Sequence, residues 1–298
     1  IDEYFRTDGK DANKIEVSIV DGEITVKDNG RGLPQEISDN NKTMAEIAVT
    51  SLRAGTNFEE NSVSIGTNGL GASLVNLFSK SFKVTTTDGK NRLKLESSNN
   101  MNKTLVSITK NSGKSGTSIS YFPDYERFNM ENLDEDHIEF IKKRLIDLAA
   151  CFSSIKFSFN GEKITTSKFS NYCNMISHNN EIVESNNFKI GVISSETKDQ
   201  ISFVNGIETF RGGGHVEYVS THISYEILEK LNKKHKLKLK ISDIKNKLMF
   251  VVFLTGVNGL TFDSQTKERI TNTSRFFQSY FDTKKMNQIE WDIYSNWH

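Results

Sequence analysis

Two hairpin signals constrain the fold of this chain more than any other feature of its sequence. Residues 14–28 hold two runs of alternating apolar and polar side chains, which meet at Asp21-Gly22. A second pair of runs, over 155–166, meets at Asn160-Gly161. Such dipeptides favour the tight turns that join antiparallel strands, because both central residues accept positive φ. The chain is therefore expected to build largely antiparallel sheets and not a parallel doubly wound sheet.

Helical and strand patterns mix in both halves of the chain, which is typical of an α+β protein. Helical spacing predicts helices over 134–152, near 216–234 and after the glycines that end at Gly71, with an amphipathic piece over 44–52. Further strands are predicted over 92–98, 104–110, 117–123, 188–194, 200–209 and 248–254. Residues 170–187 show little pattern. For 298 residues we expect two domains, 1–168 and 169–298.

The composition excludes several classes of protein. Acidic and basic residues number 38 each, so bulk attraction to nucleic acid is not predicted, although a local basic patch is compatible with this balance. Cys151 and Cys173 have no metal-ligand spacing, which favours a reduced, cytoplasmic setting. The longest apolar run, 248–254, is too short to span a bilayer, and no membrane partner is expected. The chain starts at Ile1, and we expect residues to precede it in the parent protein.

The stretch "DNGRGLP" is the first candidate binding element. Asp28 ends a predicted strand, and Gly30 and Gly32 open the turn that follows. A carboxylate at a strand end, beside backbone that carries no Cβ, is able to accept a hydrogen bond from a ligand amine. An ordinary Asx turn that ends the strand explains the same residues.

The stretch "GTNGLGASLVN" is the second candidate. Gly66, Gly69 and Gly71 come just before a predicted helix, where bare backbone N–H groups are able to approach a phosphate. The spacing matches neither the P-loop nor the dinucleotide-binding fingerprint. A simple mobile loop is the alternative interpretation.

Two further stretches carry candidate side chains. Thr117 would place its hydroxyl at a strand start, although an ordinary strand residue is the simpler explanation. Gln265 and Lys267, in "FDSQTKERI", would face the same way in extended backbone, and an ammonium there is able to neutralise a terminal phosphate. A solvated turn is the alternative. The basic run 233–247 is expected to form an amphipathic strand, with a DNA-facing surface as the minority interpretation, and His215 is expected at a helix entry.

Together, "DNGRGLP", "GTNGLGASLVN", "GTSISYFPD" and "FDSQTKERI", in this order, resemble the ATPase region of type IIA DNA topoisomerases. "SFVNGIETFRGGGHVEYV" is similar to that family's second domain. The resemblance implies a Bergerat-type (GHKL) ATPase sandwich over 1–168, followed by a transducer domain over 169–298. It also implies ATP and Mg²⁺ as cofactors, without assigning a metal ligand to any residue of this sequence.

The resemblance implies a role for each candidate residue. Asp28 would bind the adenine amino group, with support from Thr117 through water, and Gly30 and Gly32 would let the base lie close. The phosphates would be wrapped by the glycine-rich stretch, namely Gly66, Asn68, Gly69, Leu70 and Gly71. Gln265 and Lys267 would reach the γ-phosphate and report ATP to the rest of the enzyme.

The resemblance further implies a homodimer, closed by ATP around DNA, that works with a DNA-cleaving domain or subunit. Three departures stand against a complete enzyme. The family's catalytic Glu and its magnesium-binding Asn would precede Ile1, Gly214 replaces the usual Thr, and nothing after 270 resembles a DNA-cleaving domain. Two alternatives therefore stay open: a catalytically silent nucleotide-binding dimerisation module, and a chaperone or mismatch-repair relative with the same ATP fold.

Overall fold

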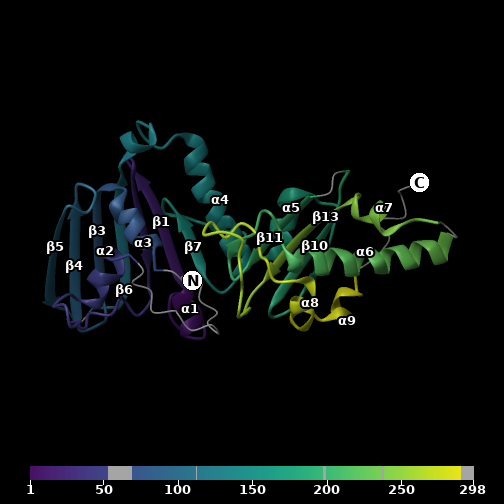
Figure 1. The fold of residues 1–298 in the computed structure, drawn as a ribbon, viewed down its shortest axis with the longest axis horizontal. Coiled ribbons are helices and arrows are strands. Elements are labelled where there is room, and N and C mark those ends of the chain that lie inside the picture. The colour runs from purple at the N-terminus through teal and green to yellow at the C-terminus, as the bar shows by residue number, and fades with distance from the viewer. Residues whose placement is uncertain (53–68, 112, 197–198, 236–237, 290–298) are drawn as a thin grey trace. The chain divides into compact units, whose positions relative to one another are not determined.

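The computed structural model describes residues 1–52, 69–111, 113–196, 199–235 and 238–289. The chain divides into two compact units, Ile1–Thr165 and Thr166–His298. Figure 1 labels the helices and strands. The expected domain boundary at 168/169 lies beside this division. Each unit contains one sheet with helices packed against it.

The first unit is built on an eight-stranded sheet with the order β5-β4-β3-β6-β2-β1-β7-β8. Its strands are β1 (Lys14–Val20), β2 (Glu23–Asp28), β3 (Ser79–Thr87), β4 (Asn91–Ser98), β5 (Lys103–Lys110), β6 (Gly116–Pro123), β7 (Lys156–Phe159) and β8 (Glu162–Lys163). All neighbours are antiparallel except β1 and β7, which run parallel. Largely antiparallel pairing, expected from the hairpin signals, is confirmed.

Both predicted hairpins are present. Val20 pairs with Glu23 across the first turn, where Asp21 and Gly22 both have positive φ. Phe159 pairs with Glu162 across the second turn, where Asn160 and Gly161 also have positive φ. The strand β3 was missed by sequence analysis, because "SKSFKVTTT" follows a helical pattern without a turn signal between them.

Helices cover one face of this sheet. They are α1 (Asp2–Arg6), α2 (Met44–Thr50), α3 (Gly71–Leu77) and α4 (Glu135–Cys151), with a short 3-10 helix η1 (Tyr125–Phe128). Leu93 and Leu95 of β4 are fully buried under α2, while the residues between and beside them point to solvent. This alternation is the period-two pattern of a strand with one buried face.

The second unit holds a five-stranded sheet with the order β12-β11-β13-β10-β9. Its strands are β9 (Asn180–Glu184), β10 (Phe188–Ser194), β11 (Asp199–Val204), β12 (Ile207–Glu208) and β13 (Leu248–Leu254). The central strand β13 is buried almost throughout, as its continuous apolar sequence predicts, and runs parallel to β11.

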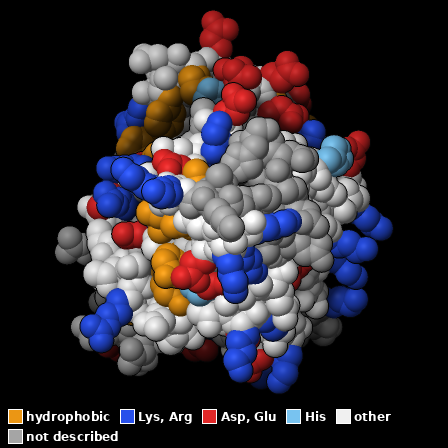
Figure 2. Space-filling view, turned by 90° about the vertical axis from the view of Figure 1, so that its right-hand side faces the viewer, with side chains coloured by type: hydrophobic (Ala, Val, Ile, Leu, Met, Phe, Trp, Pro, Cys, Tyr) orange, Lys and Arg blue, Asp and Glu red, His pale blue; other side chains and the backbone are white. Residues whose placement is uncertain are grey.

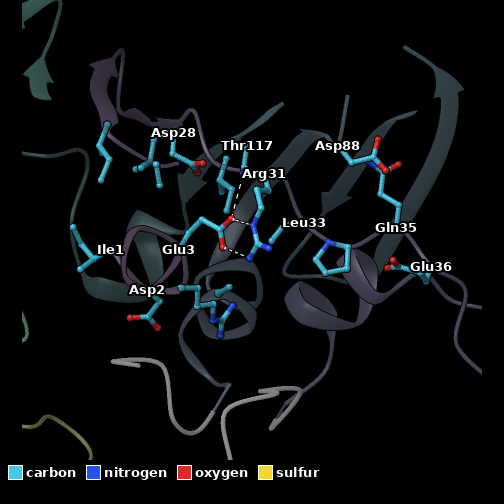
Figure 3. Close-up of a pocket in the computed structure, with 18 residues that line it drawn as sticks. Ile1, Asp2, Glu3, Asp28, Arg31, Leu33, Gln35, Glu36, Asp88 and Thr117 are labelled. Carbon is cyan, nitrogen blue, oxygen red and sulfur yellow. Dashed lines mark hydrogen bonds and ion pairs between the residues drawn. The ribbon is translucent and has the colours of Figure 1, made fainter. Parts of the chain in front are cut away.

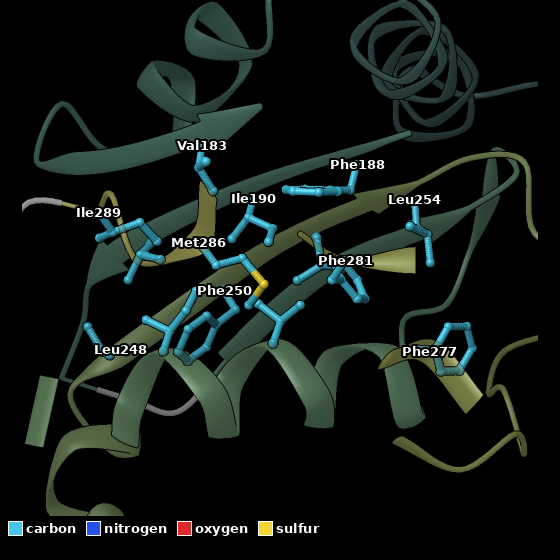
Figure 4. Packing of buried hydrophobic residues seen from close by; sticks show 14 of the residues in the cluster. Val183, Phe188, Ile190, Leu248, Phe250, Leu254, Phe277, Phe281, Met286 and Ile289 are labelled. Atoms are coloured by element: carbon cyan, nitrogen blue, oxygen red, sulfur yellow. The ribbon is translucent and has the colours of Figure 1, made fainter. Parts of the chain in front are cut away.

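The helices of the second unit are α5 (Phe169–Ile176), α6 (Gly214–His235), α7 (Ile241–Lys245), α8 (Ser274–Phe277) and α9 (Thr283–Met286), with η2 (Gln278–Tyr280). Figure 4 shows side chains of β10 and β13 packed against α6 and the segment with α8 and α9. Phe188, Phe277 and Phe281 belong to this core. The region after 270, which had no predicted structure, therefore completes the core of the unit.

Two expectations for the second unit were wrong. Residues 170–187 are not patternless: they contain most of α5, where Phe169, Tyr172 and Cys173 are buried, and all of β9. The basic run does not form a strand over its described part, because 233–235 end α6 and Ile241–Lys245 form α7. No helix in the described part of the chain is long and apolar enough to cross a membrane.

Candidate nucleotide-binding site

A pocket of about 910 Å³ opens in the first unit, between the sheet and the loop that follows β2. Asp28, the last residue of β2, lies on its wall, as does Thr117, which pairs with Asp28 across the β2–β6 ladder. Glu3 and Arg31 line the same space (Figure 3). The volume falls in the range of small-molecule sites.

The Asp28 carboxylate is a strong acceptor with spare capacity. Within the described residues it accepts one hydrogen bond, 2.8 Å from the N–H of Gly30. A carboxylate has room for about four. Burial, the largest influence, raises the pKa of Asp28 above its ordinary value, and the Gly30 hydrogen bond opposes this shift. A donor on a ligand would therefore stabilise a charge that the protein alone solvates poorly.

Gly32 is required by the packing of the protein itself. Its φ is +86°, and a Cβ at this position would lie 2.3 Å from the carbonyl oxygen of Thr87. The loop after β2 thus rests directly on the end of β3. This contact holds the loop beside Asp28, and it is a structural reason for the glycine that the sequence pattern alone did not reveal.

A hydroxyl network supports this wall of the pocket. The hydroxyl oxygens of Thr117 and Thr86 lie 3.1 Å apart, and the N–H of Leu33 donates to Thr86 Oγ1 over 2.7 Å. Thr86 is fully buried. Sequence analysis could not find it, because β3 itself was not predicted.

A bidentate ion pair was also missed. Arg31 Nε and Nη2 donate to the two carboxylate oxygens of Glu3 over 2.6 and 3.1 Å, and the Arg31 N–H donates to Glu3 Oε1 over 3.3 Å. These hydrogen bonds lower the pKa of Glu3. Arg31 stood in the "DNGRGLP" stretch without an assigned role, and only the tertiary structure brings α1 to it.

The glycine-rich stretch reaches the described structure at its end. Gly69 has a φ of +58°. Gly71 begins α3, and apart from its chain neighbours and its own helix no described atom lies within 4 Å of the place where a Cβ would stand. The next residue, Ala72, lines the pocket. Gly66 and Asn68 lie outside the described residues. Leu70, the residue before α3, is partly buried.

Gln265 and Lys267 belong to the second unit. We had expected an extended backbone here, but the chain turns at 265–266. Lys267 has a φ of +60°, and its ammonium lies 5.8 Å from the centre of the Phe262 ring. A positive φ at a residue other than glycine stores roughly 1–3 kcal/mol of strain, which persists where the surroundings demand it.

Comparison with known proteins shows which families the chain resembles. Residues 2–126 match the family described as "Histidine kinase-, DNA gyrase B-, and HSP90-like ATPase", and residues 136–283 match "DNA gyrase B". The DNA topoisomerase large subunit of Enterobacteria phage T4 is 33% identical over 99% of this chain and 58% of its own length. DNA topoisomerase 2 of Pisum sativum is 33% identical over 94% of this chain and 21% of its own length.

Solved structures of related proteins have a similar fold. The ATPase region of Saccharomyces cerevisiae topoisomerase II matches with a TM-score of 0.86 at 29% identity, over 96% of this chain and 78% of that one. The ATPase and transducer domains of topoisomerase II from Balamuthia mandrillaris match with a TM-score of 0.87 over the same shares. The chain spans somewhat more than half of the phage relative's length and about a fifth of the plant relative's. With its GHKL-type ATPase fold, this chain belongs to the type II DNA topoisomerase family as an ATPase region.

Proposed function

We propose that the pocket of the first unit binds ATP, with Asp28 accepting a hydrogen bond from the adenine amino group. The observation that carries this proposal is the buried Asp28 carboxylate, which has a single described hydrogen-bond donor and lines a cavity of about 910 Å³. A carboxylate in such a place favours a ligand that brings an N–H group. Thr117 is the second polar group of the base site, and its hydroxyl already shares a hydrogen bond with Thr86.

The phosphates would lie toward the start of α3. Gly69, Leu70 and Gly71 would offer backbone N–H groups there, joined by Gly66 and Asn68 from the preceding residues. This is supported by the surroundings of Gly71, where no described residue outside its own helix would obstruct a close ligand.

Mg²⁺ would accompany the phosphates. The described residues gather no cluster of three or more His, Cys, Asp or Glu side chains. In nucleotide enzymes Mg²⁺ is held chiefly by phosphate oxygens, water and one or two carboxylates. When bound, the ion would neutralise phosphate charge during transfer.

The first unit is proposed to be the ATPase domain and the second the transducer. Lys267 would neutralise the γ-phosphate, and Gln265 would hydrogen-bond to it, so that only ATP draws the loop in. The positive φ of Lys267 supports a functional reason for its position.

In the parent enzyme, ATP would close a homodimer around a DNA segment, which a DNA-cleaving domain or subunit then lets pass. Lys and Arg side chains lie in several separate groups on the face shown in Figure 2, between acidic ones. This mixture agrees with the zero net charge, which gives no bulk attraction to DNA.

The test of the base site compares ATP with inosine triphosphate, each as a non-hydrolysable analogue, by calorimetry on this chain. Inosine has a carbonyl oxygen where adenine has the amino group, so it would place an acceptor against the Asp28 carboxylate. We expect the ATP analogue to bind at least about tenfold more tightly, the value of one charge-assisted hydrogen bond. Equal affinity would refute adenine recognition by Asp28.

A further inference from the structure

The loop that carries Gln265 and Lys267, residues 263–269, rests on the segment 209–214, which precedes and begins α6. The N–H of Arg211 donates to the carbonyl of Glu268 over 3.1 Å. The N–H of Ile270 donates to the carbonyl of Gly212 over 3.2 Å. The C-terminal end of the loop is therefore held by backbone hydrogen bonds to 209–214.

Two glycines let these segments approach closely. A Cβ at Gly213 would lie 2.7 Å from the carbonyl oxygen of Ile270, and one at Gly214 would lie 2.3 Å from that of Asn272. No side chain fits at either place without a shift of the backbone. The path of the chain directly after the loop, over 270–272, is thus set by direct backbone contact.

The N-terminal end of the loop is held by a side chain. Arg211 Nη1 lies 3.0 Å from Asp263 Oδ2, and Asp263 is the first residue of the loop. The N–H of Asp263 in turn donates to the carbonyl of Arg269 over 3.2 Å, which closes the base of the loop. Arg211 is therefore bonded to both ends of the loop, through its guanidinium to Asp263 and through its backbone N–H to Glu268.

The segment 209–214 is itself firmly anchored. The Thr209 hydroxyl lies 2.6 Å from that of Ser202 on β11 and 3.1 Å from His215 Nε2 on α6, and all three residues are buried. Burial lowers the pKa of His215 to about 3, so the ring stays neutral and the anchor does not vary over the working pH range.

We propose that Arg211 is a positioning residue for Lys267, because its ion pair with Asp263 fixes the direction in which the loop 263–269 begins. This rests on the proposed function, in which Lys267 reaches the γ-phosphate. Arg211 would not touch the nucleotide. It would keep the loop in the one arrangement from which the Lys267 ammonium reaches its target, and displacements of about 1 Å already impair catalysis severely.

The ion pair is half exposed on the Arg211 side, so it contributes little to the stability of the fold. Its effect is expected on the loop. Charge reversal in Arg211→Glu replaces an attraction with a repulsion. We expect kcat/KM for ATP to fall roughly five- to tenfold, the scale of an exposed pair that is removed and then reversed. ADP affinity and the thermal midpoint should stay unchanged, since ADP lacks the γ-phosphate.

The experiment measures ATP turnover, ADP affinity and thermal unfolding in the full-length protein that contains this chain. The variants are Arg211→Glu, Asp263→Arg and the double exchange, with Lys284→Glu on α9 as a charge-reversal control and Lys267→Ala as a reference. We expect both single variants to lose turnover, the double exchange to regain most of it, and the control to match the wild type.

The outcomes separate the two proposals. If Lys267→Ala lowers turnover but Arg211→Glu does not, or if the double exchange fails to restore it, Arg211 is not a positioning residue and the proposed function stands. If Lys267→Ala has no effect, the γ-phosphate role itself is wrong, and the inference falls with it. A loss of ADP affinity in Arg211→Glu equal to the loss of turnover would also overturn the inference.

Discussion

Replacement of Asp28 by Asn tests the nucleotide site most sharply, because it should lower ATP affinity without lowering the stability of the nucleotide-free protein. Asn keeps the size of the side chain and an oxygen that is able to accept the 2.8 Å hydrogen bond from Gly30. It loses the charge that would favour the adenine amine. A charge-assisted hydrogen bond contributes about 1.5–3 kcal/mol, so ATP affinity should fall roughly 10- to 150-fold.

The stability of the nucleotide-free protein should not fall. Burial raises the pKa of Asp28 in the folded state, so folding favours the protonated carboxyl over the charged one. The contribution of this group to the free energy of unfolding is complete below the unfolded pKa, and it is lost as the pH rises through the folded pKa. Above the folded pKa the buried charge therefore costs stability, and there Asp28→Asn should unfold at the same temperature as the wild type or a higher one. The difference should shrink as the pH is lowered toward the pKa of Asp28.

Calorimetry with a non-hydrolysable ATP analogue gives the affinity, and thermal unfolding at several pH values gives the stability. Glu36→Gln is the matched control, since it removes an exposed carboxylate from the same pocket. Unchanged affinity in Asp28→Asn would remove Asp28 from the site. A variant that loses affinity and stability together would mean that Asp28 acts by holding the loop after β2 in place.

Three further predictions follow from the same geometry. Lys267→Ala should lower ATP turnover on the order of 100-fold while ADP affinity, measured beside it, changes little; equal losses would contradict γ-phosphate contact. Gly32→Ala should destabilise the first unit by more than about 1 kcal/mol in denaturant unfolding, because φ is +86° and the Thr87 carbonyl blocks a Cβ. Gly71→Ala, where no described atom meets the added Cβ, should be neutral or mildly stabilising. Gly214→Ala should destabilise by a similar amount although alanine has a higher intrinsic helix propensity than glycine, and a stabilised variant would show that the backbone of 272–274 shifts at little cost.

Most of the local structure was predictable from short stretches of sequence. The Asp21-Gly22 and Asn160-Gly161 turns were predictable because positive φ at two successive residues is a local property. The strands β10 and β13 agree with their predicted bounds, since apolar runs between turn residues have few other solutions. The order of four motifs was enough to recognise the family, although none was specific alone.

Elements whose local signal is weak needed the tertiary structure. Strand β3 became visible only in its pairing with β4 and β6, and α7 formed within the basic run 233–247, for which a strand had been predicted. In both cases packing decided between conformations that differ little in local preference. The turn at 265–266 and the positive φ of Lys267 likewise depend on neighbours outside the loop.

For the candidate site, residue types were predictable and their geometry was not. Asp28, Gly32 and Thr117 could be chosen from short motifs, because strand ends and glycine-bearing turns are written locally. The Glu3–Arg31 pair and the support from Thr86 could not, since each joins segments far apart in the sequence. The same holds for the contact of Arg211 with Asp263. Hydrogen bonds and burial act over a few ångströms in space, and only the folded chain decides which distant residues come within that reach.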